Sequence, residues 1–205
     1  QLYWPEYRAT LQCVPRVLTA DTRCLDSRQF PEAPTILITS PPYANRYDYT
    51  RSYCLELCFD FVQNFNELRT LRHSILRSHI ESKTSDEDRP PHPVIREVVE
   101  NLNCKSLNNP RIPHMITAYF VDMEKAIREW SKVLAPGARV AMVVDNVRFE
   151  DELIPADLVL CEIADRYGFI TQEVVVARYK GNSSQQMGKY GRVRVRESVV
   201  IWRKT

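Results

Sequence analysis

Glycine is scarce in this chain of 205 residues. The sequence holds five glycines, whereas the usual share of roughly 7% would give about three times as many. All five lie between Gly137 and Gly191. The first two thirds of the sequence therefore contain no glycine-rich turn of the kind that cradles a phosphate or a cofactor.

Other signals are lacking as well. No apolar run approaches the roughly 20 residues that a membrane helix needs, and the first residues lack the basic and apolar regions of a signal peptide. The six cysteines form no CxxC pair, and none of the four histidines has a partner at metal-ligand spacing. We therefore expect reduced thiols, no metal and a cytoplasmic location, with Cys54 and Cys58 packed on a helix face.

Charge is almost balanced, with 28 Lys and Arg against 26 Asp and Glu. A protein of this kind has no overall positive field, so any binding to nucleic acid must come from local basic patches. The 44% hydrophobic and 26% charged fractions are those of a globular protein and exclude a wholly disordered chain.

The hydrophobic pattern predicts alternating strands and helices. Strands are expected at 14–20, 35–39, 139–144, 169–179 and 193–202, and helices at about 53–62, 116–134 and 154–167. This order predicts an α/β fold with a mostly parallel sheet, whose last two strands form an antiparallel hairpin. Residues 1–63 and 114–205 are expected to form the core. Residues 64–113, where the pattern weakens, are interpreted as an insertion that acts in target recognition or as a lid.

Four residues that follow the predicted strand at 35–39 carry the clearest chemical signal: Ser40-Pro41-Pro42-Tyr43. Ligands of open α/β sheets gather beyond the carboxyl ends of the strands. The prolines stiffen the loop and leave the Pro41 carbonyl free to accept a hydrogen bond. Ser40 adds a second acceptor, and Tyr43 adds an aromatic face. This combination suits an exocyclic amino group on a flat heterocycle, although a stiff turn that merely ends a strand is the alternative.

The segment resembles the (Asp/Asn/Ser)-Pro-Pro-(Tyr/Phe) motif of S-adenosylmethionine-dependent amino-methyltransferases, which methylate N4 of cytosine or N6 of adenine in DNA. The similarity to bacterial DNA modification methylases continues through residues 38–51 and 55–57, and it returns at 119–123, 133–137, 196–198 and Lys204. The resemblance implies a Rossmann-like methyltransferase sheet and S-adenosylmethionine as the cofactor.

The resemblance also implies roles for single residues. Ser40 and the Pro41 carbonyl would hold the target amino group and lie against the cofactor, while Pro42 completes the catalytic motif. Tyr43 would stack on a base flipped out of double-stranded DNA. Asp21 matches an acidic position near the cofactor adenine, with a turn or helix N-cap as the open alternative.

Basic and aromatic residues beside these segments are candidates for DNA contact. They are Arg46, Tyr47, Tyr49 and Arg51 after the motif, and Lys180, Lys189 and Arg192 near the end of the chain. The competing interpretations are salt bridges of the following helix for the first group and an ordinary hairpin loop for the second.

With serine at the first motif position, the chain resembles the cytosine-N4 members of the family more than the adenine-N6 members. The resemblance thus implies methylation of cytosine N4 in a bacterial restriction-modification system, in the cytoplasm at the nucleoid. An adenine-N6 enzyme, an RNA methyltransferase and an inactive DNA-binding or assembly subunit are the alternatives. The family's Asp-Pro-Phe-x-Gly-Ser-Gly-like loop has no match here. The sheet is therefore expected to be incomplete in its N-terminal half, and a second polypeptide or chain segment is expected to carry the glycine-rich cofactor loop.

Overall fold

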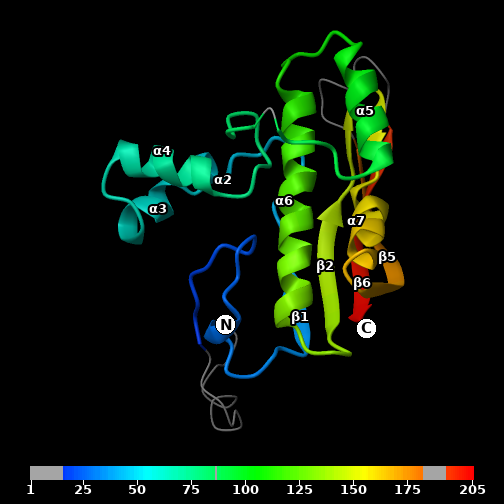
Figure 1. Ribbon diagram of the computed structural model, residues 1–205. Helices are drawn as coiled ribbons and strands as arrows, with labels where there is room; N and C mark the ends of the chain where they lie inside the picture. The colour runs from blue at the N-terminus through cyan, green and yellow to red at the C-terminus, as the bar shows by residue number, and fades with distance from the viewer. Residues whose placement is uncertain (1–15, 86, 182–192) are drawn as a thin grey trace.

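A four-stranded sheet forms the centre of the computed structural model, which describes residues 16–85, 87–181 and 193–205. Its order is β1 (Ile36–Thr39), β2 (Arg139–Asp145), β6 (Arg194–Lys204) and β5 (Phe169–Gly181). β1 and β2 pair in parallel, and β6 lies antiparallel between β2 and β5. Three strands thus run in one direction and β6 in the other. This arrangement confirms the predicted mostly parallel α/β sheet with an antiparallel terminal strand (Figure 1).

Three helices cover one face of this sheet: α5 (Pro93–Asn103), α6 (Ile112–Val133) and α7 (Ala156–Asp165). Their apolar sides meet alternate residues of β2 and β6, and Phe120, Ile127 and Trp202 are fully buried there. α6 ends at Val133, and the turn that follows contains Pro136 and Gly137, where Gly137 takes a φ of +77° that favours glycine. The Lys204 side chain donates a 2.5 Å hydrogen bond to the Leu134 carbonyl at the same end.

The opposite face of the sheet carries exposed apolar side chains. β1 is an edge strand, and Ile36 and Ile38 on its outer face are 64% and 78% exposed. Leu37, which alternates with them, packs against the core. Large apolar side chains are seldom this exposed on an edge strand, because an exposed apolar edge can pair with a strand of another chain.

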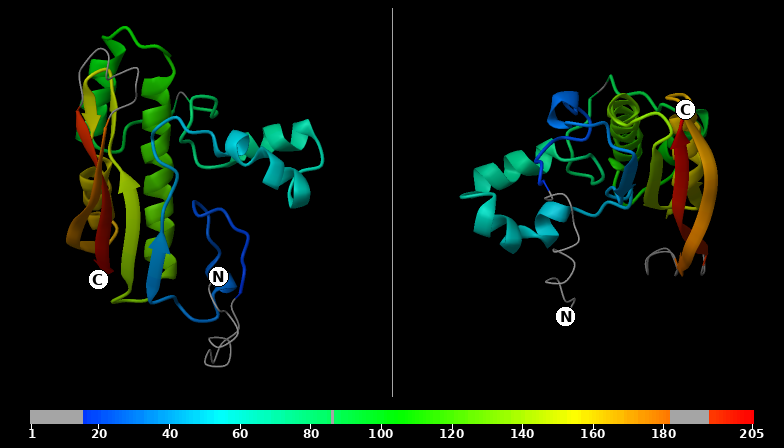
Figure 2. Two further views of the ribbon diagram at one scale, coloured as in Figure 1. Left: turned by 180° about the vertical axis from the view of Figure 1, so that it is seen from behind. Right: turned by 90° about the horizontal axis from the view of Figure 1, so that it is seen from below.

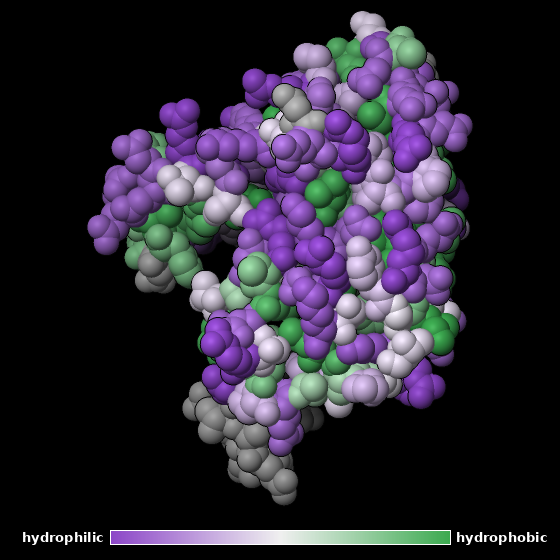
Figure 3. Space-filling model, viewed as in Figure 1, coloured by the Kyte–Doolittle hydropathy of each residue, from purple (hydrophilic) through white to green (hydrophobic). Residues whose placement is uncertain are grey.

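A helical arm stands away from the sheet (Figures 1 and 2). It consists of α2 (Tyr49–Ser52), α3 (Cys54–Asp60) and α4 (Phe65–Ser74). α3 lies within the helix predicted at 53–62, but the expectation that Cys54 and Cys58 both pack on a helix face was wrong for Cys58. Phe59 and Phe61 are 84% and 73% exposed, and Cys58 is exposed too. The periodicity predicted a helix correctly. Val62 at its end is buried, but much of the apolar side of the arm is exposed, and Figure 3 shows apolar surface there.

Two further expectations need correction. Residues 16–20 form no strand, because no neighbouring strand pairs with them and Val17 is 94% exposed; residues 14 and 15 lie outside the described part. The helix expected at 154–167 begins at Ala156, since residues 152–154 form β4 (Glu152–Ile154), which pairs with β3 (Val147–Phe149).

The segment 64–113 is not uniform. α4 belongs to the arm, whereas α5 packs with α6, and its Ile95 and Leu102 are fully buried in the main core. The assignment of this segment as a recognition insertion or lid stays a prediction.

Candidate functional site

The candidate site lies where the carboxyl ends of β1, β2 and β5 meet the start of β6. The motif Ser40-Pro41-Pro42-Tyr43 follows β1 directly, and Asp145 ends β2. Glu197 of β6 is the register partner of Asp145 on one side and of Arg178 of β5 on the other. Sheet pairing therefore brings residues from four separate parts of the sequence to one edge, as expected for an open α/β sheet.

Tyr43 is fixed by contacts from two distant strands. Its hydroxyl donates a 3.0 Å hydrogen bond to Glu197 Oε1 and lies 3.4 Å from Ser40 Oγ. The Lys180 ammonium stands 5.4 Å from the centre of its ring, within range of a cation–π contact. Pro41 is buried, while Ser40 is exposed. The motif thus presents an accessible hydroxyl beside an aromatic ring of fixed orientation.

Charges around Tyr43 form one connected group. Lys180 Nζ lies 2.9 Å from Asp145 Oδ2 and 3.2 Å from Glu197 Oε1, and Arg178 binds Glu197 Oε2. The hydrogen bond from Arg178 lowers the pKa of Glu197 to about 2. Burial raises the pKa of Tyr43, and Glu197 raises it further. Glu197 is therefore an anion and Tyr43 a neutral hydrogen-bond donor at neutral pH.

Side chains of the triplet Arg196-Glu197-Ser198 make contacts on two faces of β6. Glu197 points to Tyr43, while Arg196 Nε and Ser198 Oγ each donate a 2.7 Å hydrogen bond to Asp157 Oδ2. Asp157 is fully buried in the first turn of α7. Because side chains alternate across a strand, one triplet can orient the site and anchor the strand to α7. The sequence drew attention to this triplet, but Tyr43 as the partner of Glu197 was not predicted.

Residues just after the motif are engaged with the protein itself. Arg46 has a φ of +71°, donates a 3.1 Å hydrogen bond to Asn108 Oδ1 and stands over the Phe149 ring. Arg51 forms ion pairs with Asp48 at 3.5 Å and with Glu81 at 2.5 Å. The salt-bridge interpretation of Arg51 thus has direct contacts, whereas its contact with DNA stays a prediction.

The two tyrosines of this group stack within the protein. Tyr47 is 48% exposed and meets Tyr49 edge to face at 4.9 Å between ring centres. Tyr49 in turn stacks on Tyr53 at 6.2 Å. Of the two, Tyr47 therefore offers the more accessible ring.

The second group of candidate DNA contacts lies near the end of the chain. Lys180 forms ion pairs with Asp145 and Glu197, while Lys189 and Arg192 lie outside the described residues.

A small hollow adjoins the motif. It is lined by ten residues from the loop after the motif, the end of β2, the turn that follows it, and the strands β5 and β6: Asn45, Arg46, Asp145, Asn146, Val147, Arg148, Phe149, Lys180, Gly181 and Val195. Amide, carboxylate, guanidinium and ammonium groups thus line this space, and two of the lining residues, Asp145 and Lys180, belong to the charged group around Tyr43.

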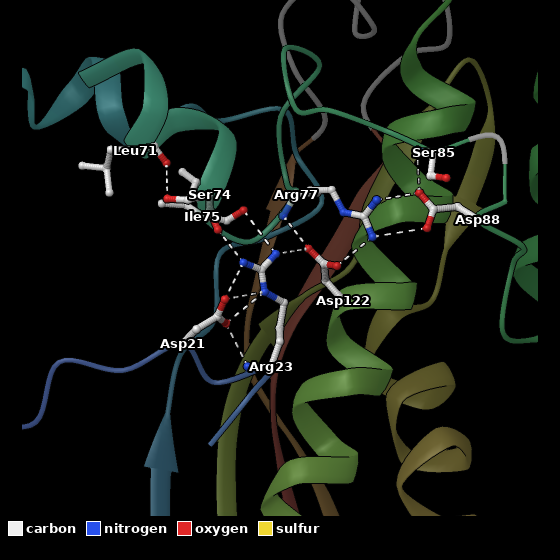
Figure 4. A network of polar contacts seen from close by, with 9 residues as sticks. All are labelled: Asp21, Arg23, Leu71, Ser74, Ile75, Arg77, Ser85, Asp88 and Asp122. Carbon is white, nitrogen blue, oxygen red and sulfur yellow. Dashed lines mark hydrogen bonds and ion pairs between the residues drawn. The ribbon is translucent and has the colours of Figure 1, made fainter. Parts of the chain in front are cut away.

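Asp21 belongs to a network of ion pairs (Figure 4). Arg23 binds its carboxylate through Nη2 at 2.7 Å, and the Cys24 amide donates to the Asp21 carbonyl at 2.9 Å, which makes a turn. Arg23 Nη1 and Arg77 Nη2 also reach Asp122 of α6, at 2.8 and 2.7 Å. The turn interpretation of Asp21 therefore has a structural basis. Its carboxylate is still 49% exposed, and the cofactor role stays a prediction.

Sequence comparison places the chain among relatives of the methyltransferase class. No family model matches it. The similar curated proteins are the type II methyltransferases M.AvaI of Nostoc sp. strain PCC 7120, 40% identical over 182 residues, and M.BsoBI of Geobacillus stearothermophilus, 37% identical over 192 residues. Each alignment covers 82% of this chain and 38% of the relative. The chain is thus homologous to a part of bacterial type II DNA methyltransferases and spans well under half of their length.

Among solved structures, the Thermus thermophilus protein TTHA0409, a DNA modification methylase by its name, aligns in its complex with S-adenosyl-L-methionine. The TM-score is 0.43 at 16% identity, over 91% of this chain and 54% of the other. Another structure of TTHA0409 gives a TM-score of 0.43 at 13% identity, over 91% of this chain and 52% of the other. Likeness at this level supports no functional conclusion. Among the described helices, none combines the length and the apolar character needed to cross a membrane.

Proposed function

We propose that this chain carries the catalytic motif of an enzyme that transfers a methyl group from S-adenosylmethionine to an exocyclic amino group of a DNA base, with N4 of cytosine as the favoured target. The observation that carries the proposal is the fixed position of Tyr43, held by Glu197 and Lys180 beside the accessible Ser40 hydroxyl. The homology to type II methyltransferases supports the same reaction class.

The proposed reaction is a direct displacement at the methyl carbon. S-adenosylmethionine, when bound, supplies a methyl group activated by its sulfonium. Ser40 Oγ and the Pro41 carbonyl accept the two N–H groups of the target amine, which aims its lone pair at the methyl carbon. The N–C bond would form as the C–S bond breaks, with S-adenosylhomocysteine as the leaving group, and the nitrogen would then release its extra proton to solvent. Acceptors at this position stabilise the positive charge that grows on nitrogen.

Tyr43 would form the platform on which the flipped base stacks. Its hydroxyl is held by Glu197 and one side of its ring is near Lys180, so the ring cannot turn freely. A fixed aromatic face reduces the ordering cost when a planar base binds. We propose that two groups of side chains lie along the DNA. They are Arg46, Tyr47, Tyr49 and Arg51 after the motif, and Lys180, Lys189 and Arg192 near the end of the chain.

This chain supplies only part of a cofactor site. Asp21, Ser40 and Pro41 are proposed to face the cofactor, but the sequence has no glycine-rich loop to hold it. We infer that a second polypeptide or chain segment brings that loop and packs beside β1, where Ile36 and Ile38 are exposed. Burial of those side chains would contribute to the association at about 25 cal/mol per Å².

Methyl transfer to DNA from tritiated S-adenosylmethionine tests the proposal, with the chain assayed together with the polypeptide or segment that completes it. Digestion of the product to nucleosides should give labelled N4-methylcytosine. Label in N6-methyladenine would select the adenine enzyme, and label in RNA alone the RNA enzyme. DNA binding without any transfer would select the inactive subunit.

The motif residues can be tested in the same assay. Ser40→Ala and Tyr43→Ala should each lower the turnover by about 100-fold or more, because acceptors and platforms of this kind contribute on that scale. Tyr43→Phe, which keeps the ring, should lose less. Ser131→Ala, near the end of α6 at the opposite end of the sheet, is the control. Normal turnover in both alanine variants of the motif would place the chemistry elsewhere.

A further inference from the structure

A second cluster of ligand-type side chains lies outside the proposed catalytic site. Asp48, His79 and Glu81 each offer one ligand atom, and these three atoms lie within 4.8 Å of one another. Asp48 is the N-cap of α2, five positions after Tyr43, and the other two residues lie in the segment after α4. The cluster therefore joins two parts of the chain that are about thirty residues apart.

His79 is the residue that makes this cluster unusual. It is 1% exposed, and neither of its ring nitrogens has a hydrogen-bond partner among the described residues. A buried polar group without a partner destabilises the folded protein, so native structures rarely keep one. An imidazole with a free ring nitrogen is a common metal ligand.

The two carboxylates are oriented by partners on their outer sides. Asp48 Oδ1 accepts hydrogen bonds from the Thr50 amide at 2.9 Å and the Thr50 hydroxyl at 2.6 Å. Glu81 Oε1 accepts one from Arg51 Nη2 at 2.5 Å. The inner oxygens, Asp48 Oδ2 and Glu81 Oε2, are buried and make no hydrogen bond within the described chain. Carboxylates that bind metal ions are usually oriented in this way by hydrogen bonds from neighbouring groups.

Two guanidinium groups stand near the inner oxygen of Asp48. Arg72 Nε lies 3.0 Å from Asp48 Oδ2, but its N–H donates to Thr50 Oγ1 at 2.9 Å. Arg51 Nε is more distant, at 3.5 Å from the same oxygen. Since neither group donates a hydrogen bond to Oδ2, lone pairs of this oxygen remain available to a metal ion.

A hollow adjoins the cluster and offers a path of entry. Its lining includes His79, Glu81, Arg111 and His114. His79 and Glu81 therefore border a space that an ion can reach from outside. His114, which is exposed, lines the same space.

We propose that Asp48, His79 and Glu81 bind one divalent transition-metal ion, of the class that takes mixed nitrogen and oxygen ligands. A purely oxygen-seeking ion such as Ca²⁺ or Mg²⁺ fits less well, because imidazole is one of the three ligands. Ligands of a tetrahedral ion lie about 3.4 Å apart, so binding draws the three side chains slightly together and leaves a fourth position for water. The ion ties the loop after the catalytic motif to the segment after α4, and this proposal does not depend on methyl transfer.

Cobalt(II) is a suitable probe because its spectrum reports the ligand type. The purified chain, first treated with a chelator, is dialysed against Co²⁺ and its bound metal and absorption are measured. We expect one Co²⁺ per chain without a thiolate charge-transfer band. His79→Ala and Glu81→Gln should weaken binding at least 10-fold, the lower end of the effect expected for metal-site residues, while His114→Ala, on the exposed rim, should not. Circular dichroism checks that each variant is folded, and Glu81→Gln preserves shape if His79→Ala does not fold.

Three outcomes would overturn the proposal. One is no binding to the wild-type chain, which would mean that ordered water fills the space. Another is a thiolate band that persists in both variants, which would assign the metal to Cys54 and Cys58. The third is an equal loss of binding in His114→Ala, which would indicate surface histidine binding.

Discussion

Glu197 shows how one residue acquires its role from neighbours that are remote in the sequence. It accepts the Tyr43 hydroxyl, binds Arg178 and lies 3.2 Å from Lys180. The positive partners explain why its pKa falls to about 2. Since Tyr43 belongs to the motif and Glu197 does not, Glu197 is a positioning residue for the proposed base platform.

The lowered pKa of Glu197 predicts a pH dependence of stability. A carboxylate with a depressed folded-state pKa stabilises the folded protein above its ordinary pKa of 4.5 and loses this contribution as the pH falls toward the lowered value. Glu197→Gln should therefore be less stable than wild type at about pH 6, and the difference should shrink toward about pH 3. Urea denaturation across this range measures it.

The exposed Glu173 of β5 supplies the matched control. Glu173→Gln should follow the wild-type curve more closely than Glu197→Gln does at neutral pH. A Glu197→Gln deficit that stays constant from neutral to acid pH would contradict the assigned ion pairs.

At the scale of elements, Asp122 connects α6 with two loops. Its carboxylate is 1% exposed and receives Arg23 Nη1 at 2.8 Å, the Arg77 amide at 3.1 Å and Arg77 Nη2 at 2.7 Å (Figure 4). Arg23 also binds Asp21, and Arg77 binds Asp88. The network holds the segment that carries Asp21 against the helix layer, although that segment forms no strand.

Loss of the Asp122 carboxylate should therefore be expensive. Asp122→Ala leaves two largely buried guanidinium groups without their central partner, and breaking a buried ion pair costs about 3–5 kcal/mol. Arg28→Ala removes an exposed pair with Asp26 and should cost far less, because water screens the attraction between exposed charges. Free energies of unfolding from urea denaturation compare the two. An equal loss of unfolding free energy in the two variants would mean that the buried Asp122 network stabilises the protein no more than an exposed ion pair does.

At the scale of the whole molecule, the sheet has a covered face and an uncovered edge. α5, α6 and α7 cover one face, whereas Ile36 and Ile38 of β1 are exposed on the other. The alignments cover 38% of the length of each curated relative. An apolar edge of this kind agrees with the proposed partner segment, because an exposed strand edge is a template for pairing.

Ile38→Asp tests this surface. The side chain is 78% exposed, so its replacement should change the melting temperature of the chain alone by little. The same change should prevent stable association with the segment that carries the cofactor loop, because it would bury an unpaired charge. Co-expression followed by gel filtration measures association. Undiminished association of Ile38→Asp would locate the partner on another surface.

The sequence by itself determined those elements whose pattern reflects burial within the chain. The apolar periodicity after Ile116 predicted most of α6, whose inner side meets the sheet, and the run at 35–39 predicted β1 within one residue. The motif after β1 also placed the candidate site at a strand end, since local order and chain direction suffice for that inference.

Only the tertiary structure decided which face of each element is covered and which distant side chains meet. The helical pattern at 53–62 is real, yet Phe59 and Phe61 are exposed because nothing in the described chain packs on them. Tyr43 and Glu197 are 154 positions apart, and their contact depends on the register of β6 between β2 and β5. Periodicity records that a residue prefers burial, whereas the partner that buries or binds it is set by strand pairing and packing across the whole molecule.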